Sequence, residues 1–217
     1  MSLPTAEIVT ASMRSSRRAL LLPAAGAAVA AALAGVTLVG WQLELLLLRR
    51  VGWGAAQLLP VTALMLLALA GALASARAAI LRSPERLWYG AIWICTAIAL
   101  APSLWTLLEG AIQLGVAREL ASLGDRVFAG AGAANPGASA AMTALSVICI
   151  GVSIGASALA GRHATLVRVA FGAFGVAIPF LALLAYADGA AVLHNSPALL
   201  ANGMSLPTAL GLVALGA

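Results

Sequence analysis

The stretch that decides the fold class spans residues 53–76 and reads WGAAQLLPVTALMLLALAGALASA. It contains no charged residue, and Arg77, Arg82 and Arg86 follow it. At about 1.5 Å of rise per residue, a helix over this range can cross the ~30 Å hydrocarbon core of a bilayer. The stretch therefore predicts a transmembrane helix that ends in a basic turn.

Comparable apolar runs occur along the rest of the chain. The 217 residues are 63% hydrophobic and 9% charged, whereas a soluble domain carries roughly 25% charged residues. The runs predict helices at about 19–43, 53–76, 87–108, 142–160 and 167–186, with a sixth from 204. We therefore expect an all-α, polytopic membrane bundle of about six transmembrane helices over residues 19–217, after a cytoplasmic segment at 1–18.

The basic residues exclude some functions and argue against others. All twelve are Arg, and the absence of Lys excludes a retinal Schiff base. A pI near 10.6 would suggest nucleic-acid binding in a soluble protein, but arginines at helix ends set membrane topology, so no nucleic-acid partner is expected. Cys95 and Cys149 lie inside apolar runs without metal-ligand spacing. We interpret them as small packing residues and expect neither a metal nor a cofactor.

The distribution of charge predicts an orientation. With the N-terminus inside, the inner segments hold eight arginines and two glutamates, a net charge of +6, and the outer segments hold four arginines and five acids, a net charge of −1. This bias predicts a bacterial inner-membrane protein with both termini in the cytoplasm. The inner charges are Arg14, Arg17, Arg18, Arg77, Arg82, Arg86, Arg162, Arg168, Glu7 and Glu85.

The connecting segments differ in character. Residues 113–128 alternate charged and apolar side chains in a pattern that suits a helix on the membrane surface. Residues 129–141 and 188–203 are expected to be loops. The final run, 204–217, is too short to cross the hydrocarbon core, so we expect the natural protein to continue beyond Ala217.

A Thr-Ala-Leu triplet begins three of the predicted helices, at Thr62, Thr143 and Thr208. The first two helices are each followed by a returning helix that contains a proline and ends in an acid-Gly-Ala triplet. This order predicts parallel helix-hairpin repeats at about 57–111 and 140–190, with a third starting at 204–217. The matched prolines and acids are Pro102 with Pro179 and Glu109 with Asp188.

The segment NGMSLPTALG at 202–211 resembles an element of bacterial multi-helix membrane sensor regions. There, a Met-Ser/Ala-x-x-Thr-Ala-Leu stretch opens a helix and repeats along the membrane part. The segment that contains Asn135-Pro136-Gly137 and Met142-Thr143-Ala144-Leu145 resembles the preceding copy. The resemblance implies a cytoplasmic PAS, histidine kinase or diguanylate cyclase module in the same chain. No kinase or cyclase motif lies within residues 1–217, so any catalysis would belong to that module.

Three residues are candidate ligand-binding groups: Glu109, Asp188 and His194. Carboxylates at the edge of an apolar span are functional candidates, and repeats packed side by side would bring the two acids into one outer vestibule. The alternative is that both acids end their helices at the water interface. His194, in the outer loop, is either a solvated interfacial residue or a sensor of external pH. Gly151-x-x-x-Gly155 permits close helix approach, either within the bundle or in a homodimer.

These features favour a membrane-embedded input region of a signalling protein, with the lipid bilayer as its surroundings. A stimulus would displace packed helices, and the last helix would carry the displacement to the output module. The alternative is a non-signalling subunit, either a small transporter half or an accessory subunit of a membrane complex. Proline-containing helices in matched repeat positions are typical of transporters.

Overall fold

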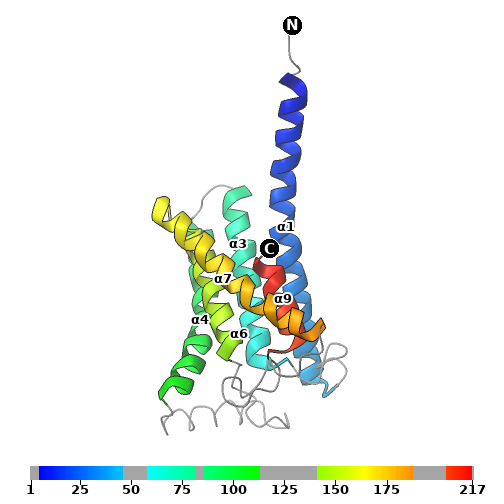
Figure 1. Cartoon of the computed structure of the whole chain (residues 1–217), viewed down its shortest axis with the longest axis vertical. Helices are drawn as coiled ribbons and strands as arrows, with labels where there is room; N and C mark the ends of the chain where they lie inside the picture. The colour runs from blue at the N-terminus through cyan, green and yellow to red at the C-terminus, as the bar shows by residue number, and fades with distance from the viewer. Residues whose placement is uncertain (1–4, 46–57, 82–85, 113–140, 188–203, 217) are drawn as a thin grey trace.

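A computed structural model describes the backbone of residues 5–45, 58–81, 86–112, 141–187 and 204–216 (Figure 1). These residues form six α-helices and contain no strand, which confirms the all-α class. The helices are α1 (Thr5–Gln42), α3 (Pro60–Leu81), α4 (Arg86–Ile112), α6 (Ala141–Ala156), α7 (Arg162–Ala187) and α9 (Leu206–Gly216). The predicted surface helix at 113–128 and both predicted loops lie outside the described residues, apart from Ala141, which begins α6.

Four helices are long and apolar enough to cross a membrane. A helix satisfies its own backbone hydrogen bonds, so it is the form that an apolar segment can take in lipid. The four candidate spans are Pro23–Gln42, Pro60–Leu81, Arg86–Leu108 and Arg162–Leu184. The remaining two, α6 and α9, have 16 and 11 residues, which corresponds to about 24 Å and about 17 Å of helix.

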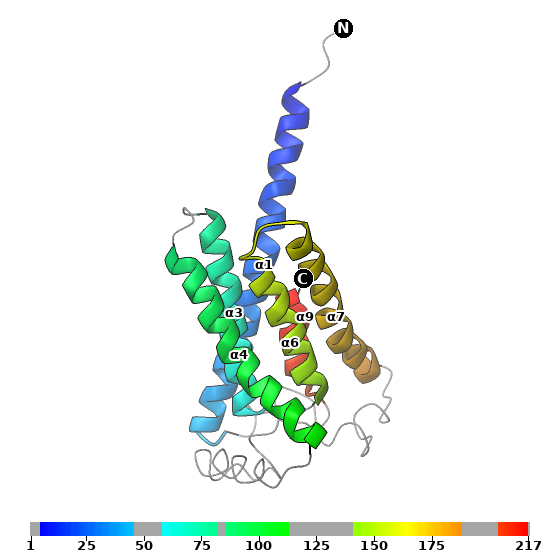
Figure 2. The same cartoon turned by 90° about the vertical axis from the view of Figure 1, so that its left-hand side faces the viewer.

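Helix α1 begins earlier than its apolar run. The apolar residues start at Ala19, but the helix starts at Thr5 and continues without a break through Pro23 to Gln42. Its first half projects past the other helices, as both views show (Figures 1 and 2). The segment at 5–18 is therefore a helical extension of the first span.

The turn between α6 and α7 lies earlier than the sequence predicts. Helix α6 ends at Ala156, because the Ser157 N–H bonds to the Ile154 carbonyl in a tight i−3 pattern that closes the last turn. Gly161 then adopts a φ of 119°, which favours glycine. Helix α7 starts directly after it, so Arg162 and His163 form the first turn of α7 rather than a loop.

The six helices form an inner group of three and an outer group of three. Helices α3, α6 and α9, which carry the three Thr-Ala-Leu triplets, all contact one another. Helix α1 packs against α3 and α9, α4 against α3 and α6, and α7 against α6 and α9. The contacts close a ring in which α1 and α9 touch. We call α3, α6 and α9 the inner helices and α1, α4 and α7 the outer helices.

Candidate functional site

Of the three predicted ligand-binding residues, none has a described side chain. Asp188 and His194 lie outside the described residues, and Glu109 lies on the backbone of α4 in a part where side chains are not described. The outer vestibule shared by Glu109 and Asp188 therefore stays a prediction. The threonines and prolines of the predicted repeat, in contrast, are all described.

The Thr-Ala-Leu triplets occupy equivalent environments on the three inner helices. Thr62, Thr143 and Thr208 are 4%, 2% and 2% exposed, and the alanine after each threonine is fully buried. The leucine that follows is exposed in every copy, at 46%, 40% and 44%. These leucines are Leu64, Leu145 and Leu210. Each triplet thus turns the same face of its helix toward the interior.

The equivalence continues along each helix. The residues four positions after each threonine, Leu66, Val147 and Leu212, are fully buried. Those seven positions after it, Leu69, Ile150 and Leu215, are buried as well. Spacings of four and seven keep these side chains on one face of an α-helix. The apolar stripes that follow the three threonines on their helices therefore form the centre of the bundle.

Buried hydroxyl groups gather where the inner helices begin, and we call this region the threonine end. Ser205 Oγ lies 2.6 Å from Thr208 Oγ1, and the Ser146 hydroxyl donates to the Met142 carbonyl at 2.9 Å. The Ser103 hydroxyl of α4 lies 3.0 Å from Met65 Sδ of α3. The buried hydroxyl residues here are Thr37, Thr62, Ser103, Thr143, Ser146, Ser205 and Thr208.

Chemically, the threonine end can align helices and offer neutral hydrogen-bonding groups. The Trp41 indole N–H donates to the Leu58 carbonyl at 2.9 Å and so fastens the end of α1 to the residues before α3. Within the described part of the chain, His, Cys, Asp and Glu side chains form no group of three that could hold a metal ion. The arrangement suits helix packing better than acid–base chemistry.

Glycines set the closest helix crossings. A methyl group added at Gly26 of α1 would clash with the backbone carbonyl of Ala214 on α9. One added at Gly175 of α7 would lie 2.6 Å from Ile150 Cγ1 and 3.0 Å from the Ile150 backbone nitrogen. Backbones that approach this closely have no room for any side chain at the crossing.

The predicted packing residues face neighbouring helices of the bundle. A Cβ built at Gly151 would lie 3.1 Å from Leu100 of α4, and one built at Gly155 would lie 3.4 Å from Trp93. Both glycines therefore line the contact between α6 and α4. Of the two prolines matched in the predicted repeat, Pro179 is buried and Pro102 is half-buried.

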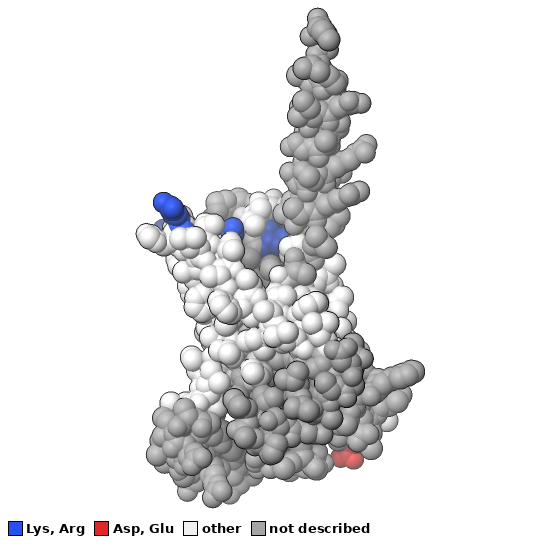
Figure 3. All heavy atoms as spheres, viewed as in Figure 1, with Lys and Arg blue, Asp and Glu red and all other residues white. Residues whose placement is uncertain are grey.

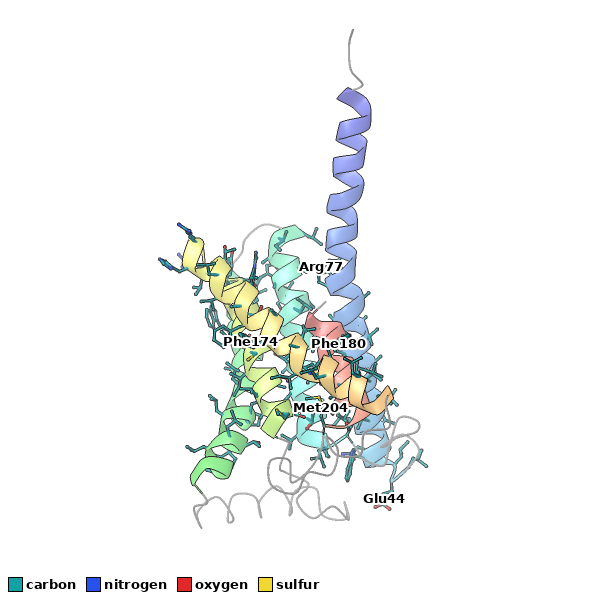
Figure 4. All side chains as sticks on the ribbon, viewed as in Figure 1. Glu44, Arg77, Phe174, Phe180 and Met204 are labelled. Carbon is teal, nitrogen blue, oxygen red and sulfur yellow. The ribbon has the colours of Figure 1, made fainter. Side chains whose placement is uncertain are left out.

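The opposite end of the bundle is basic, and we call it the arginine end. Arg77 of α3, Arg86 of α4, and Arg162 and Arg168 of α7 lie toward it. The space-filling view shows blue atoms gathered at this end and the red atoms of an acidic residue at the other (Figure 3). That acid is Glu44, which is labelled in Figure 4 with Arg77 at the far side of the bundle.

Sequence reasoning missed two features that fix the helices. No close packing is predicted from the sequence at Gly26 or Gly175, although small residues three apart at Gly172 and Gly175 are a recognisable sign of it. The Ser153 hydroxyl, which donates to the Arg168 carbonyl at 2.8 Å, joins α6 to α7. No local pattern predicts that bond, because its partners come from different helices.

Comparison with known proteins adds no family to this description. No family model, no curated protein and no solved structure matches the chain.

Proposed function

We propose that this chain is the membrane input region of a bacterial signalling protein, and that α9 is the helix that moves. The observation that carries the proposal is the position of α9, which contacts α1, α3, α6 and α7. A shift in any of these four helices would therefore reach α9. In this proposal the arginine end faces the cytoplasm, in keeping with the charge bias of the sequence.

Small residues on α9 support a sliding or rotating contact. Gly211 faces Leu66 of α3, where an added Cβ would lie 3.2 Å from the leucine Cδ1. Gly216 faces Val176 of α7, and an added methyl group would clash with that side chain. Closely packed helices with small contact residues can adopt discrete alternative arrangements, which is what a two-state switch requires.

The threonine end supplies a means of biasing such a switch. Ser205 and Thr208 are buried at the start of α9, and Met204 beside them is labelled in Figure 4. A stimulus that changes packing or hydration there would alter the hydrogen bond between Ser205 and Thr208. The displacement would then travel along α9 to an output module that follows residue 217 in the same chain.

The decisive experiment places one bulky residue on each face of α9 in the full-length protein. Gly211→Leu pushes against Leu66, whereas Leu210→Phe enlarges a side chain that is already exposed. We expect Gly211→Leu to change the activity of the attached output module and Leu210→Phe to leave it unchanged. Membrane insertion and expression, measured in parallel, should be normal for both variants.

A measurement of position separates signalling from simple damage. Spin labels at Leu64 and Leu210, both exposed at the threonine end, report the distance between α3 and α9. We expect Gly211→Leu to shift this distance to a new, narrow distribution. Normal insertion with unchanged output and distance would reject the signalling proposal and favour an accessory subunit.

A further inference from the structure

The four described arginines at the arginine end come from three different helices. Arg86, Arg162 and Arg168 are exposed, and Arg77 is half-buried. Among the residues that the structure describes, none of these guanidinium groups pairs with a carboxylate. The sequence adds Arg82 and Glu85 between α3 and α4, which leaves this end strongly positive. A concentration of positive charge attracts an anionic partner.

The directions of the helices increase this positive charge. Arg86 and Arg162 are the first residues of α4 and α7, and neither helix has an acidic residue in its first turn. The N-terminus of a helix carries a partial positive charge and unbonded N–H groups, which favour an anion. Arginine there is the reverse of the usual preference, and no acidic residue lies near the start of α7 in the sequence, so that helix start gains from an external negative group.

The surroundings of these arginines are apolar. Leu166 and Val169 on α7 are exposed between and beside Arg162 and Arg168, and Leu87 is exposed next to Arg86 on α4. Figure 4 shows the outward side chains continuing along α7 through Phe174 and Phe180. A partner on this surface must offer negative charge at the edge and hydrocarbon directly beside it. An anionic phospholipid offers both, whereas free phosphate offers only the charge.

We propose that the arginine end binds anionic phospholipid headgroups in preference to zwitterionic ones. The phosphate groups are held by Arg77, Arg86, Arg162 and Arg168 together with the N–H groups that begin α4 and α7. The acyl chains lie along the exposed leucine and valine side chains. This inference concerns the lipid partner alone and stands whether or not α9 transmits a signal.

The test reconstitutes the full-length protein in a mixture of phosphatidylglycerol and phosphatidylcholine. Lipids that remain bound after gentle detergent extraction are then quantified by mass spectrometry. We expect enrichment of phosphatidylglycerol in the wild type, and a loss of enrichment in Arg162→Gln/Arg168→Gln. Because one arginine near a membrane surface changes affinity for anionic lipid by about fivefold, the double variant should lose most of the preference.

The matched control removes the same charge from a different part of the chain. Arg49→Gln/Arg50→Gln changes the segment between α1 and α3, whose described flanks, Trp41 and Leu58, are hydrogen-bonded to each other, and it should retain the enrichment. An equal loss in both double variants would overturn the proposal, and so would a wild type without enrichment. Inorganic phosphate at matched ionic strength should not compete, and if it abolishes the enrichment the site is one for free phosphate instead.

Two further measurements keep the test decisive if the glutamine variant does not fold. Arg162→Lys/Arg168→Lys keeps the charge and should keep the enrichment. In the wild type, added salt should reduce the enrichment progressively, because surface electrostatic attraction is screened. Enrichment that is insensitive to salt would contradict a headgroup site built on charge.

Discussion

Helices α7 and α9 are both strongly apolar, yet they occupy opposite environments. Along α9 the buried residues are Pro207, Thr208, Ala209, Gly211, Leu212 and Leu215. Along α7, large side chains such as Leu166, Phe174 and Phe180 are exposed, and the buried residues between 162 and 184 are Gly175 and Pro179. Apolar composition therefore indicates that a helix is suited to a membrane, whereas the positions of small residues indicate where it packs against another helix.

A large effect is expected where two backbones cross. Gly26→Ala in α1 places a methyl group against the carbonyl of Ala214, so α9 must move away. We expect a loss of about 1–3 kcal/mol of stability, the usual cost of overpacking. The matched control is Gly35→Ala in the same helix, where nothing lies within 4 Å of the added carbon. Unfolding of the purified protein in mixed micelles measures both, and equal stabilities would refute the close α1–α9 crossing.

A comparable loss of stability should follow from shortening a buried side chain. Leu212 of α9 is fully buried, so Leu212→Ala should cost about 2–5 kcal/mol through lost contacts and a cavity. Phe174 of α7 is largely exposed, and Phe174→Ala should change the stability of the fold far less despite removing more atoms. Thermal unfolding in one detergent compares the two variants. A greater loss for Phe174→Ala would mean that α7 has a protein partner rather than lipid on that face.

A smaller effect should come from removing the hydroxyl group of Thr208. Thr208→Val removes the hydroxyl that lies 2.6 Å from Ser205 Oγ, and it should cost about 0.5–1.5 kcal/mol. Leu210→Val, on the exposed face of the same turn, serves as the control and should be nearly neutral. The same unfolding assay reads both substitutions. If the two prove equal, the hydrogen bond at the start of α9 contributes nothing.

The smallest effect should come from the link between α6 and α7. Ser153→Ala removes the bond to the Arg168 carbonyl, and interhelical hydrogen bonds in membrane proteins contribute about 0.6 kcal/mol on average. Hydrogen exchange at the start of α7 should rise slightly while the rest of the bundle is unchanged. Ser75→Ala is the control, because its hydroxyl bonds within its own helix to the Gly71 carbonyl. Faster exchange throughout the bundle would contradict a local role.

The all-α class could be predicted from the sequence because long apolar runs are recognised from their composition alone. The sequence indicated six helical segments, of which four are long enough to be candidate spans. It placed the second at 53–76 rather than 60–81, and it missed the helical extension at 5–18, whose residues carry no apolar run. It also placed the end of the fourth helix at Ala160 rather than Ala156, because Ser157 to Ala160 are compatible with a helix until Gly161 sets the turn. Local patterns carry little information on such tertiary effects.

The candidate site was harder to predict than the fold. Glu109, Asp188 and His194 were chosen as the polar groups at the edges of apolar runs, and their environment stays untested. The repeated threonines were found because identical triplets are visible in the sequence. Which face of each triplet is buried depends on the neighbouring helices, so Leu64 could not be assigned to the exposed side in advance.

The closing of the ring by α1 and α9 has a consequence for how the protein is made. A ribosome synthesises α1 before α9, yet Gly26 on α1 is covered by Ala214 on α9. Until synthesis reaches α9, this glycine face of α1 lacks its partner in the finished fold. Assembly of the bundle should therefore stay incomplete until α9 has been synthesised, and nascent chains that lack residues 204–216 should be the ones that quality-control proteases recognise.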